Sequence, residues 1–295
     1  MLSLHTNNAS LSAQNSISTT QKSLSTSMTR LSTGYRINSA MDDAAGLQIA
    51  TRLKSQTSGM AVAMRNTQNS ISMMQTAEGA LSEVNNILVR MKDLATQSAD
   101  ASSSTDDQSA MQGEFDQLSN ELGNIMSNTK FGGSALLQAG TASKLGATAG
   151  MTFQIGADSS EKMVAKFSTE LTDVHTDIKA AAAQYDGTAG TAAATAGTEI
   201  NATNANATIG KLSTAIDSVS SLRSKLGAVA NRLDHVYNNL SNISSNTQAA
   251  AGRIMDVDFA TESSSMTSNQ MLMQAGTAML KQTNSMSSMV MSLLQ

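Results

Sequence analysis

The sequence of 295 residues contains no cysteine, no proline and no tryptophan, and few residues of either charge. The absence of cysteine excludes disulfides, thiol nucleophiles and cysteine metal ligands. The three histidines, His5, His175 and His235, have no ligand or triad partner at a recognised spacing. A net charge of −4 provides no basic surface for nucleic acid. We therefore expect a protein that is not an enzyme, holds no metal, needs no cofactor and binds no nucleic acid.

Long apolar runs are also missing. No stretch reaches the roughly 18 apolar residues that a membrane-spanning helix needs, and the most apolar segment, 270–294, is interrupted by glutamine, asparagine and serine. Residues 1–8 have neither the basic region nor the apolar region of a secretory signal peptide. We expect no membrane insertion. The residues alone allow either a soluble cytoplasmic protein or one that is exported without a cleaved signal.

Heptad spacing is the strongest pattern in the chain. Apolar residues recur every seven positions from Leu212 to Leu240, and a second series, offset by three, runs from Ala215 to Val257. This a/d seam predicts a long coiled-coil-like helix over 212–257. Shorter seams over 74–95 and 111–125 predict two more helices, with a turn and an N-cap between them at 99–107. These helices favour an elongated antiparallel bundle, which a cytosolic protein could also form.

The pattern changes after residue 130. Gly132 and Gly133 predict a helix stop, because glycine adopts the positive φ that ends a helix. Residues 151–156 alternate as in a strand, 163–167 offer a partner strand, and 158–160 a turn between them. Residues 180–208 are rich in alanine, threonine, glycine and asparagine, and we expect them to form a surface-exposed connection.

The two chain ends are amphipathic but almost uncharged. Residues 1–29 carry one lysine and no acidic side chain, and residues 263–295 carry only Lys281. Uncharged polar faces can be buried without desolvating ions. We therefore expect both helices to be surrounded by other helices in an assembly and to be mostly disordered in a monomer; the alternative is a closed hairpin within one chain. The expected packing stripes are Ile17, Leu24, Met28 and Leu31 in the first helix, and Leu272, Met279, Met286, Met289, Val290 and Leu293 in the second.

Several longer motifs match a known family. They are Leu31-Ser-Thr-Gly-Tyr-Arg-Ile-Asn-Ser-Ala40, Asp42-Asp-Ala-Ala-Gly-Leu-Gln-Ile-Ala50, 85–98, 249–262 and the end of the chain from Gln274. Through these motifs the sequence closely resembles the bacterial flagellins, over roughly residues 1–170 and 205–295. Several motifs in the same order are far more specific than one short pattern. The opening residues are similar to lateral, swarming-type flagellins, and the short interval before the last bundle helix is typical of a short form.

The resemblance implies a mainly α fold: an elongated antiparallel helical bundle with paired N- and C-terminal coiled-coil helices and a small β-hairpin region. It implies a structural subunit that self-polymerises into the extracellular flagellar filament, the propeller for motility. The implied parts are 1–41 for the N-terminal half of the filament-core coiled coil with its connector, 42–130 for the N-terminal bundle helices, 131–204 for the β-hairpin and low-complexity surface region, 205–255 for the C-terminal bundle helix, and 256–295 for the second connector and core helix.

The resemblance also implies partners. These are copies of the same chain, an export chaperone with the flagellar secretion apparatus, and the filament cap and hook–filament junction proteins. Some flagellins are detected by Toll-like receptor five, and the matching positions here are Arg90, Leu94 and Glu114, with Asp93 in place of the more usual Glu. From the residues alone, these side chains are equally a solvated bundle face. A secreted adhesin or a junction protein, present in few copies, is the alternative function.

Overall fold

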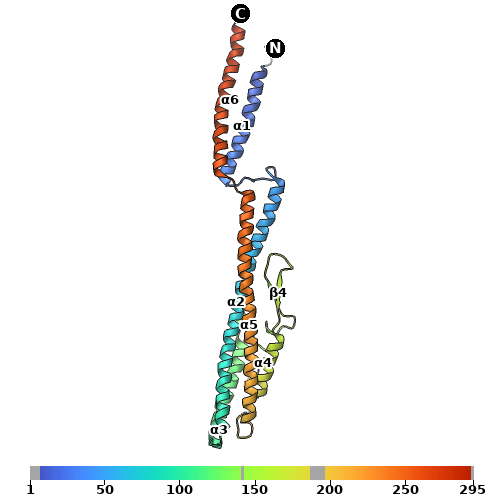
Figure 1. Cartoon of the computed structure of the whole chain (residues 1–295), viewed down its shortest axis with the longest axis vertical. Coiled ribbons are helices and arrows are strands. Elements are labelled where there is room, and N and C mark those ends of the chain that lie inside the picture. The colour runs from blue at the N-terminus through green and yellow to red at the C-terminus, as the bar shows by residue number, and fades with distance from the viewer. Residues whose placement is uncertain (1–6, 141–142, 187–196, 294–295) are drawn as a thin grey trace. The chain divides into compact units, whose positions relative to one another are not determined.

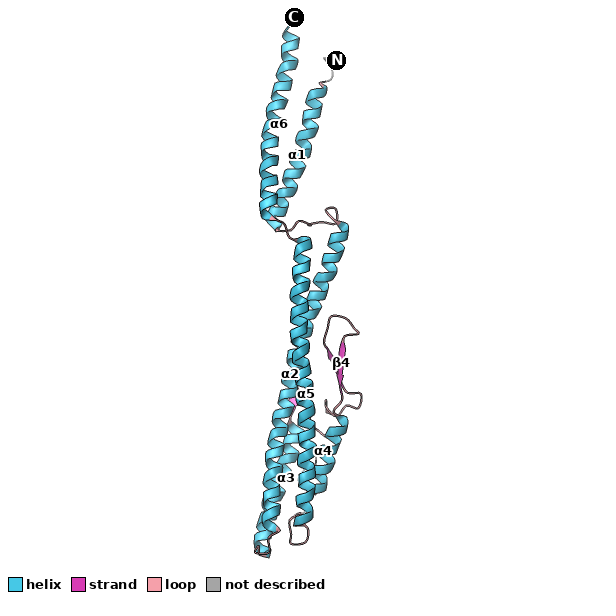
Figure 2. Cartoon of the chain, viewed as in Figure 1, coloured by secondary structure: helices cyan, strands magenta, loops and turns pink. Residues whose placement is uncertain are grey.

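The computed structural model describes residues 7–140, 143–186 and 197–293, with the side chains after Met286 left out. It divides into two compact units. We call residues 1–57 and 245–295 the end unit, and residues 58–244 the bundle unit. The described residues form six α-helices and two small antiparallel hairpins, as Figure 2 shows. The predicted fold class is confirmed: the chain is mainly helical, with paired terminal helices, a helical bundle and a small β region.

The bundle unit is built from α3 (Thr105–Asn128), α4 (Ser168–Ala181) and the parts within 58–244 of two long helices, α2 (Ala44–Ser98) and α5 (Ala205–Met255), labelled in Figure 1. The heptad seams supply its core. One series of the α5 seam is fully buried at Leu212, Val219, Leu226 and Leu233, against the buried face of α2 that includes Leu81 and Leu88. The second α5 series, which starts at Ala215, is less completely buried than predicted, because Ile243 is exposed.

The turn between α2 and α3 confirms the predicted N-cap. The Ser104 hydroxyl accepts a hydrogen bond from the Asp107 backbone N–H at 3.2 Å, and the Asp107 carboxylate accepts one from the Ser104 N–H at 3.2 Å. This capping box satisfies two backbone donors at the first turn of α3. Asp106 and Asp107 also place negative charge at the positive end of the helix dipole.

In the sequence, the β region follows α3 and precedes α4. Strand β3 (Met151–Gln154) pairs antiparallel with β4 (Lys162–Ala165), which confirms the predicted strand pair. Strands β1 (Lys130–Phe131) and β2 (Ser134–Ala135) form a shorter hairpin. Here the predicted helix stop needs correction: α3 already ends at Asn128, and the glycines at 132 and 133, with φ of 57° and 81°, form the turn of this hairpin.

The prediction of a surface-exposed connection over 180–208 holds for only part of its described residues. Residues 202–204 are exposed, but Ala182, Tyr185 and Ile200 are buried in the main hydrophobic core, although the composition is that of a low-complexity segment. Helix α4, which precedes them, was not predicted. Residues 187–196, the centre of that prediction, lie outside the described residues.

The end unit contains α1 (Asn8–Thr33) and α6 (Phe259–Leu293), which lie side by side in opposite directions. Arg30 pairs with Glu262 near one end at 3.6 Å, and the Asn7 side-chain amide donates to the Thr283 carbonyl near the other at 3.4 Å. Within the single chain both helices are formed and pack against each other, and the expected disorder of these helices in a free monomer stays a prediction. Each helix supplies the partner that the other lacks.

Two backbone segments connect α1 to α2 and α5 to α6, and they pair with each other. Gly34 ends α1 with a φ of 77°, a left-handed conformation that glycine adopts without strain. The Arg36 N–H donates to the Met255 carbonyl at 2.7 Å, and the Val257 N–H donates to the Gly34 carbonyl at 3.0 Å. Asp42 then accepts from two backbone N–H groups, at Asn38 and Ser39, and these bonds lower the pKa of its carboxyl group. The connectors are therefore ordered by backbone hydrogen bonds.

Candidate assembly surface

The contact between α1 and α6 is a seam with alternating spacings of three and four residues, as in a coiled coil. Its members are the more protected positions of each helix. On α1 they are Ala13, Ile17, Thr20, Leu24, Ser27 and Leu31, and on α6 they are Met266, Asn269, Met273, Gly276, Leu280 and Thr283. Three residues of the predicted N-terminal stripe, Ile17, Leu24 and Leu31, therefore lie in a contact within the chain.

The seam is tightest at Gly276. A Cβ atom added there would lie 2.8 Å from Cγ1 of Ile17, closer than side chains pack. Glycine at this position lets the two helix backbones approach each other. This close packing at one level, with Leu24 and Ser27 buried further along, fixes the register of the pair.

The other predicted stripe residues are exposed. Met28 is 49% exposed on α1, and Leu272, Met279 and Met286 are 59%, 64% and 56% exposed on α6. Leu272 and Met279 each precede a seam residue by one position, so they lie about 100° around the helix from the seam. We call these four exposed residues, Met28 on α1 and Leu272, Met279 and Met286 on α6, the exposed stripe; the name groups them by exposure and not by a shared face. The side chains of Met289, Val290 and Leu293 lie outside the described residues.

Two further exposed apolar side chains on these helices were missed by the sequence analysis. Leu11 on α1 and Met271 on α6 are both largely exposed. The heptad count did not include them because neither falls on the two series that were followed. Each lies two positions before a seam residue, so it faces about 160° away from the seam, outside the exposed stripe.

Several threonine hydroxyls on α1 and α6 are satisfied within their own helices. Thr19, Thr26 and Thr29 on α1 each donate a hydroxyl hydrogen bond to the carbonyl four residues earlier, at 2.9–3.1 Å. Thr267 and Thr283 do the same on α6. These hydroxyl donors lose no partner when another surface covers them. The surface of the α1–α6 pair can therefore be buried at a lower cost than a surface of lysines and glutamates.

The proposed receptor-face residues do not share one environment. Arg90 donates from Nε and Nη2 to Oε1 of Glu114, at 2.9 and 2.7 Å, and both side chains lie about half exposed on the bundle surface. Leu94 is only 2% exposed and packs in the bundle core. The structure thus brings Arg90 and Glu114 into contact on the surface, whereas Leu94, one helical turn after Arg90 on α2, is buried.

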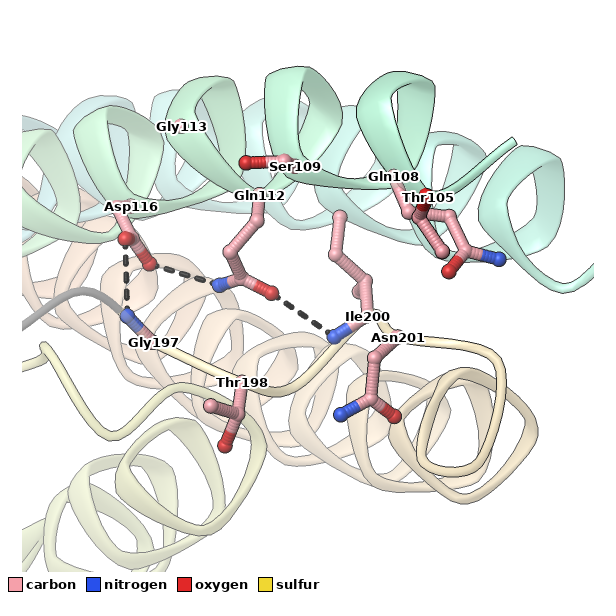
Figure 3. Close-up of a pocket in the computed structure, with 10 residues that line it drawn as sticks. All are labelled: Thr105, Gln108, Ser109, Gln112, Gly113, Asp116, Gly197, Thr198, Ile200 and Asn201. Atoms are coloured by element: carbon pink, nitrogen blue, oxygen red, sulfur yellow. Dashed lines mark hydrogen bonds between the residues drawn. The ribbon is translucent and has the colours of Figure 1, made fainter. Parts of the chain in front are cut away.

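A pocket between α3 and the segment before α5 is lined by polar side chains that include Gln112 and Asp116 (Figure 3). The Gln112 amide nitrogen donates to Asp116 at 2.8 Å and to Glu199 at 2.9 Å, and its oxygen accepts from the Ile200 N–H at 3.0 Å. Asp116 also accepts from the Gly197 N–H at 3.0 Å. These bonds fasten residues 197–200 to α3, which is a structural role. No set of three or more potential metal ligands gathers anywhere in the described parts of the chain.

His175 is buried in the same unit. Its Nδ1 accepts from the Tyr185 hydroxyl at 2.6 Å, and its Nε2 donates to the Leu137 carbonyl at 2.8 Å. Both ring nitrogens are therefore used by the neutral form, and burial lowers the pKa of the imidazole. His175 holds α4 to the chain around Leu137 and has no partner typical of catalysis. Within the described residues, no helix is both long and apolar enough to cross a membrane.

Comparison with known proteins gives a consistent match at both ends of the chain. Residues 4–143 match the family model described as the bacterial flagellin N-terminal helical region, and residues 209–294 match the bacterial flagellin C-terminal helical region. Together the two matched regions take in most of the chain, and they include both α1 and α6.

Individual relatives agree. The chain is 41% identical over 179 residues to flagellin B of Vibrio anguillarum, covering 61% of this chain and 45% of that protein. It is 44% identical over 172 residues to polar flagellin F of Vibrio parahaemolyticus, covering 58% and 44%. The matches thus span less than half the length of these relatives. A crystal structure of Bacillus cereus flagellin is 29% identical, with a TM-score of 0.46, and the match covers 63% of this chain and 94% of that one.

Proposed function

Because this chain belongs to the bacterial flagellin family, we propose that it is a structural subunit that polymerises into the flagellar filament, the extracellular propeller for motility. One observation carries the proposal beyond family membership. The α1–α6 pair leaves an apolar stripe exposed on helices that have almost no charge, a surface suited to burial among other helices. The proposal assigns the chain no enzymatic activity and no cofactor.

A filament repeats the same contact between subunits many times. Fully burying a leucine or methionine side chain contributes about 1.5–3 kcal/mol relative to leaving it in water. The four residues of the exposed stripe start roughly half exposed, so each gains about half of that on assembly. A single contact of this size is weak, but every added subunit forms it again. Heterologous contacts that do not close into a ring extend into a helical filament.

The parts of the chain take separate roles in this proposal. Residues 1–41 and 256–295 supply the filament core and its connectors. Residues 42–130 and 205–255 supply the surrounding bundle, and residues 131–204 supply the outer β-hairpin region. The support is the sequence motif at each junction and the low charge of the two terminal helices. Among the predicted stripe, Ile17, Leu24 and Leu31 act by holding α1 on α6, and the exposed stripe acts between subunits.

The finer partners remain part of the proposal. The chain would be exported through the flagellar secretion channel with a chaperone and added beneath the cap, beyond the hook–filament junction proteins. For recognition by Toll-like receptor five, the surface would be formed by Arg90 and Glu114, since Leu94 is buried. A receptor reporter assay tests this part: Arg90→Ala should reduce the response to free subunits, and an unchanged response would remove the assignment.

A truncation tests the filament proposal. We expect the full chain to form long uniform filaments after seeding, and a chain ending at residue 262 to form none, because it lacks the α6 stripe. Negative-stain electron microscopy gives the readout for both chains. Circular dichroism and thermal unfolding of the truncated chain provide the control that the bundle unit, which lies within residues 58–244, is still folded. Normal filaments from the truncated chain would contradict the proposal.

A further inference from the structure

Methionine is used in two different ways in this protein. The chain has 20 methionines. Several, including Met74, Met91 and Met126, are completely buried in the bundle core. In contrast, three of the four residues of the exposed stripe are methionines: Met28, Met279 and Met286. Flexible thioethers suit an interface that must adapt to its neighbours, but they are also a chemical target when they are exposed.

Exposed methionine reacts directly with peroxides. A sulfur lone pair attacks one peroxide oxygen, the O–O bond breaks, and a sulfur–oxygen bond forms while water leaves. The sulfur is oxidised by two electrons and hydrogen peroxide is reduced. The product, methionine sulfoxide, is polar and chiral, and it disrupts methionine-rich interfaces. Methionine sulfoxide reductases reverse the reaction.

Two threonine hydroxyls close to the exposed stripe are already engaged and are not free to bond a sulfoxide oxygen. Such an oxygen needs a hydrogen-bond donor when it is buried, and an unpaired one is costly. The Thr283 hydroxyl, one helical turn from Met279, already donates to the Met279 carbonyl at 2.8 Å. On α1, Thr29 beside Met28 already donates to the Ser25 carbonyl. An oxidised stripe would therefore have to bury polar sulfoxide oxygens without the help of these two hydroxyls.

We propose that Met28, Met279 and Met286 are reversible oxidation sites that control assembly: the free subunit with oxidised stripe methionines does not polymerise, and reduction restores polymerisation. The inference rests on the proposed filament function. In an assembled filament these thioethers are buried and protected, so peroxide acts on free subunits and spares filaments already formed.

The experiment uses the full chain and a matched control. Free subunits are treated with hydrogen peroxide, the peroxide is removed with catalase, and seeded polymerisation is followed by sedimentation. Peptide mass mapping identifies the oxidised residues. The test variant replaces Met28, Met279 and Met286 by Leu, which conserves volume and apolar character. The control is Met41→Leu, which removes the most exposed methionine, 97% exposed in the connector and outside the stripe.

We expect peroxide to raise the critical concentration of the wild-type chain and of Met41→Leu at least about tenfold, since several unpaired polar groups would be buried per subunit. The triple variant should change less than about twofold, because its exposed stripe has no sulfur to oxidise; Met271, 59% exposed on α6 but outside the stripe, is kept in every variant, and its oxidation should not affect assembly. Treating oxidised wild-type subunits with methionine sulfoxide reductases A and B should restore assembly. This rescue tests the idea without any substitution.

Three outcomes would overturn the inference. After peroxide treatment, the triple variant could lose assembly as the wild type does, or Met41→Leu could keep its assembly. Alternatively, the reductases could fail to restore assembly although mass mapping shows that the stripe methionines are reduced again. In each of these, untreated wild-type subunits still form filaments, so only the oxidation switch is refuted. If untreated wild-type subunits never polymerise, the proposed function itself is refuted, and the switch with it.

Discussion

A matched pair of leucine-to-alanine substitutions separates folding from assembly. Leu81 is fully buried in the bundle core, and Leu272 is 59% exposed on α6. Leu81→Ala removes buried methyl groups and leaves a cavity, so we expect it to lower the free energy of unfolding by about 2–5 kcal/mol. Leu272→Ala removes atoms that are mostly in water, so we expect a change within about 0.5 kcal/mol in the free subunit.

For polymerisation, we expect the larger effect from Leu272→Ala and the smaller one from Leu81→Ala. If Leu272 is buried between subunits, its truncation loses part of the roughly 1.5–3 kcal/mol that burying a leucine contributes. A loss of about 1.4 kcal/mol per subunit raises the critical concentration about tenfold. Leu81→Ala, tested at a temperature where the bundle remains folded, should leave the critical concentration within about threefold of the wild type, because Leu81 contacts only its own chain in the proposal.

Two assays on the same samples give the answer. Denaturant unfolding followed by circular dichroism, at protein concentrations below those of assembly, gives the free energy of unfolding. Sedimentation after seeding gives the critical concentration. The reasoning would be refuted if Leu272→Ala polymerised at the wild-type concentration, or if it destabilised the free subunit as strongly as Leu81→Ala.

Three further predictions concern single contacts. Burial holds the pKa of His175 below its ordinary value, so the unfolded chain binds more protons as the pH falls below about 6.5; the urea midpoint should therefore decrease between pH 7.5 and 5, and a constant midpoint would contradict this. Ser104→Ala removes the capping box of α3 and should cost about 1 kcal/mol in urea unfolding, whereas no loss would show that the cap is not used. Gly276→Leu should force α1 away from α6 by displacing Ile17, lowering helical content and abolishing filaments; intact filaments would show that the helices do not approach closely at this level.

Much of the fold followed from periodic patterns. The seam from Leu212 to Leu240 and the turn before Thr105 were predictable, because heptads and capping residues act locally and leave a direct trace in the sequence. Helix α4 was missed, although Leu171, Val174 and Ile178 have helical spacing. We did not recognise this helix because it is followed directly by residues of low complexity. The burial of those residues depends on long-range packing, which a local sequence pattern does not record.

The candidate surface was only partly predictable for a similar reason. The stripes identified which residues on the terminal helices are apolar, but not which of them meet within the chain. That division depends on the register between α1 and α6, which is set by the close approach at Gly276. Residues Ile17 and Leu24 thus lie in the seam, while Leu272 and Met279 remain exposed. For Leu94, sequence similarity indicated a surface role, and only the packing of the bundle showed that the side chain is buried.

A helical reconstruction of filaments grown from the purified chain, by electron cryomicroscopy, tests the central claim most directly. The account predicts that α1 and α6 are packed among the same helices of neighbouring subunits, and that Leu272, Met279 and Met286, each more than half exposed in the single chain, become buried there. Filaments in which these side chains still face solvent, or seeded subunits that remain monomers with folded bundles, would contradict it.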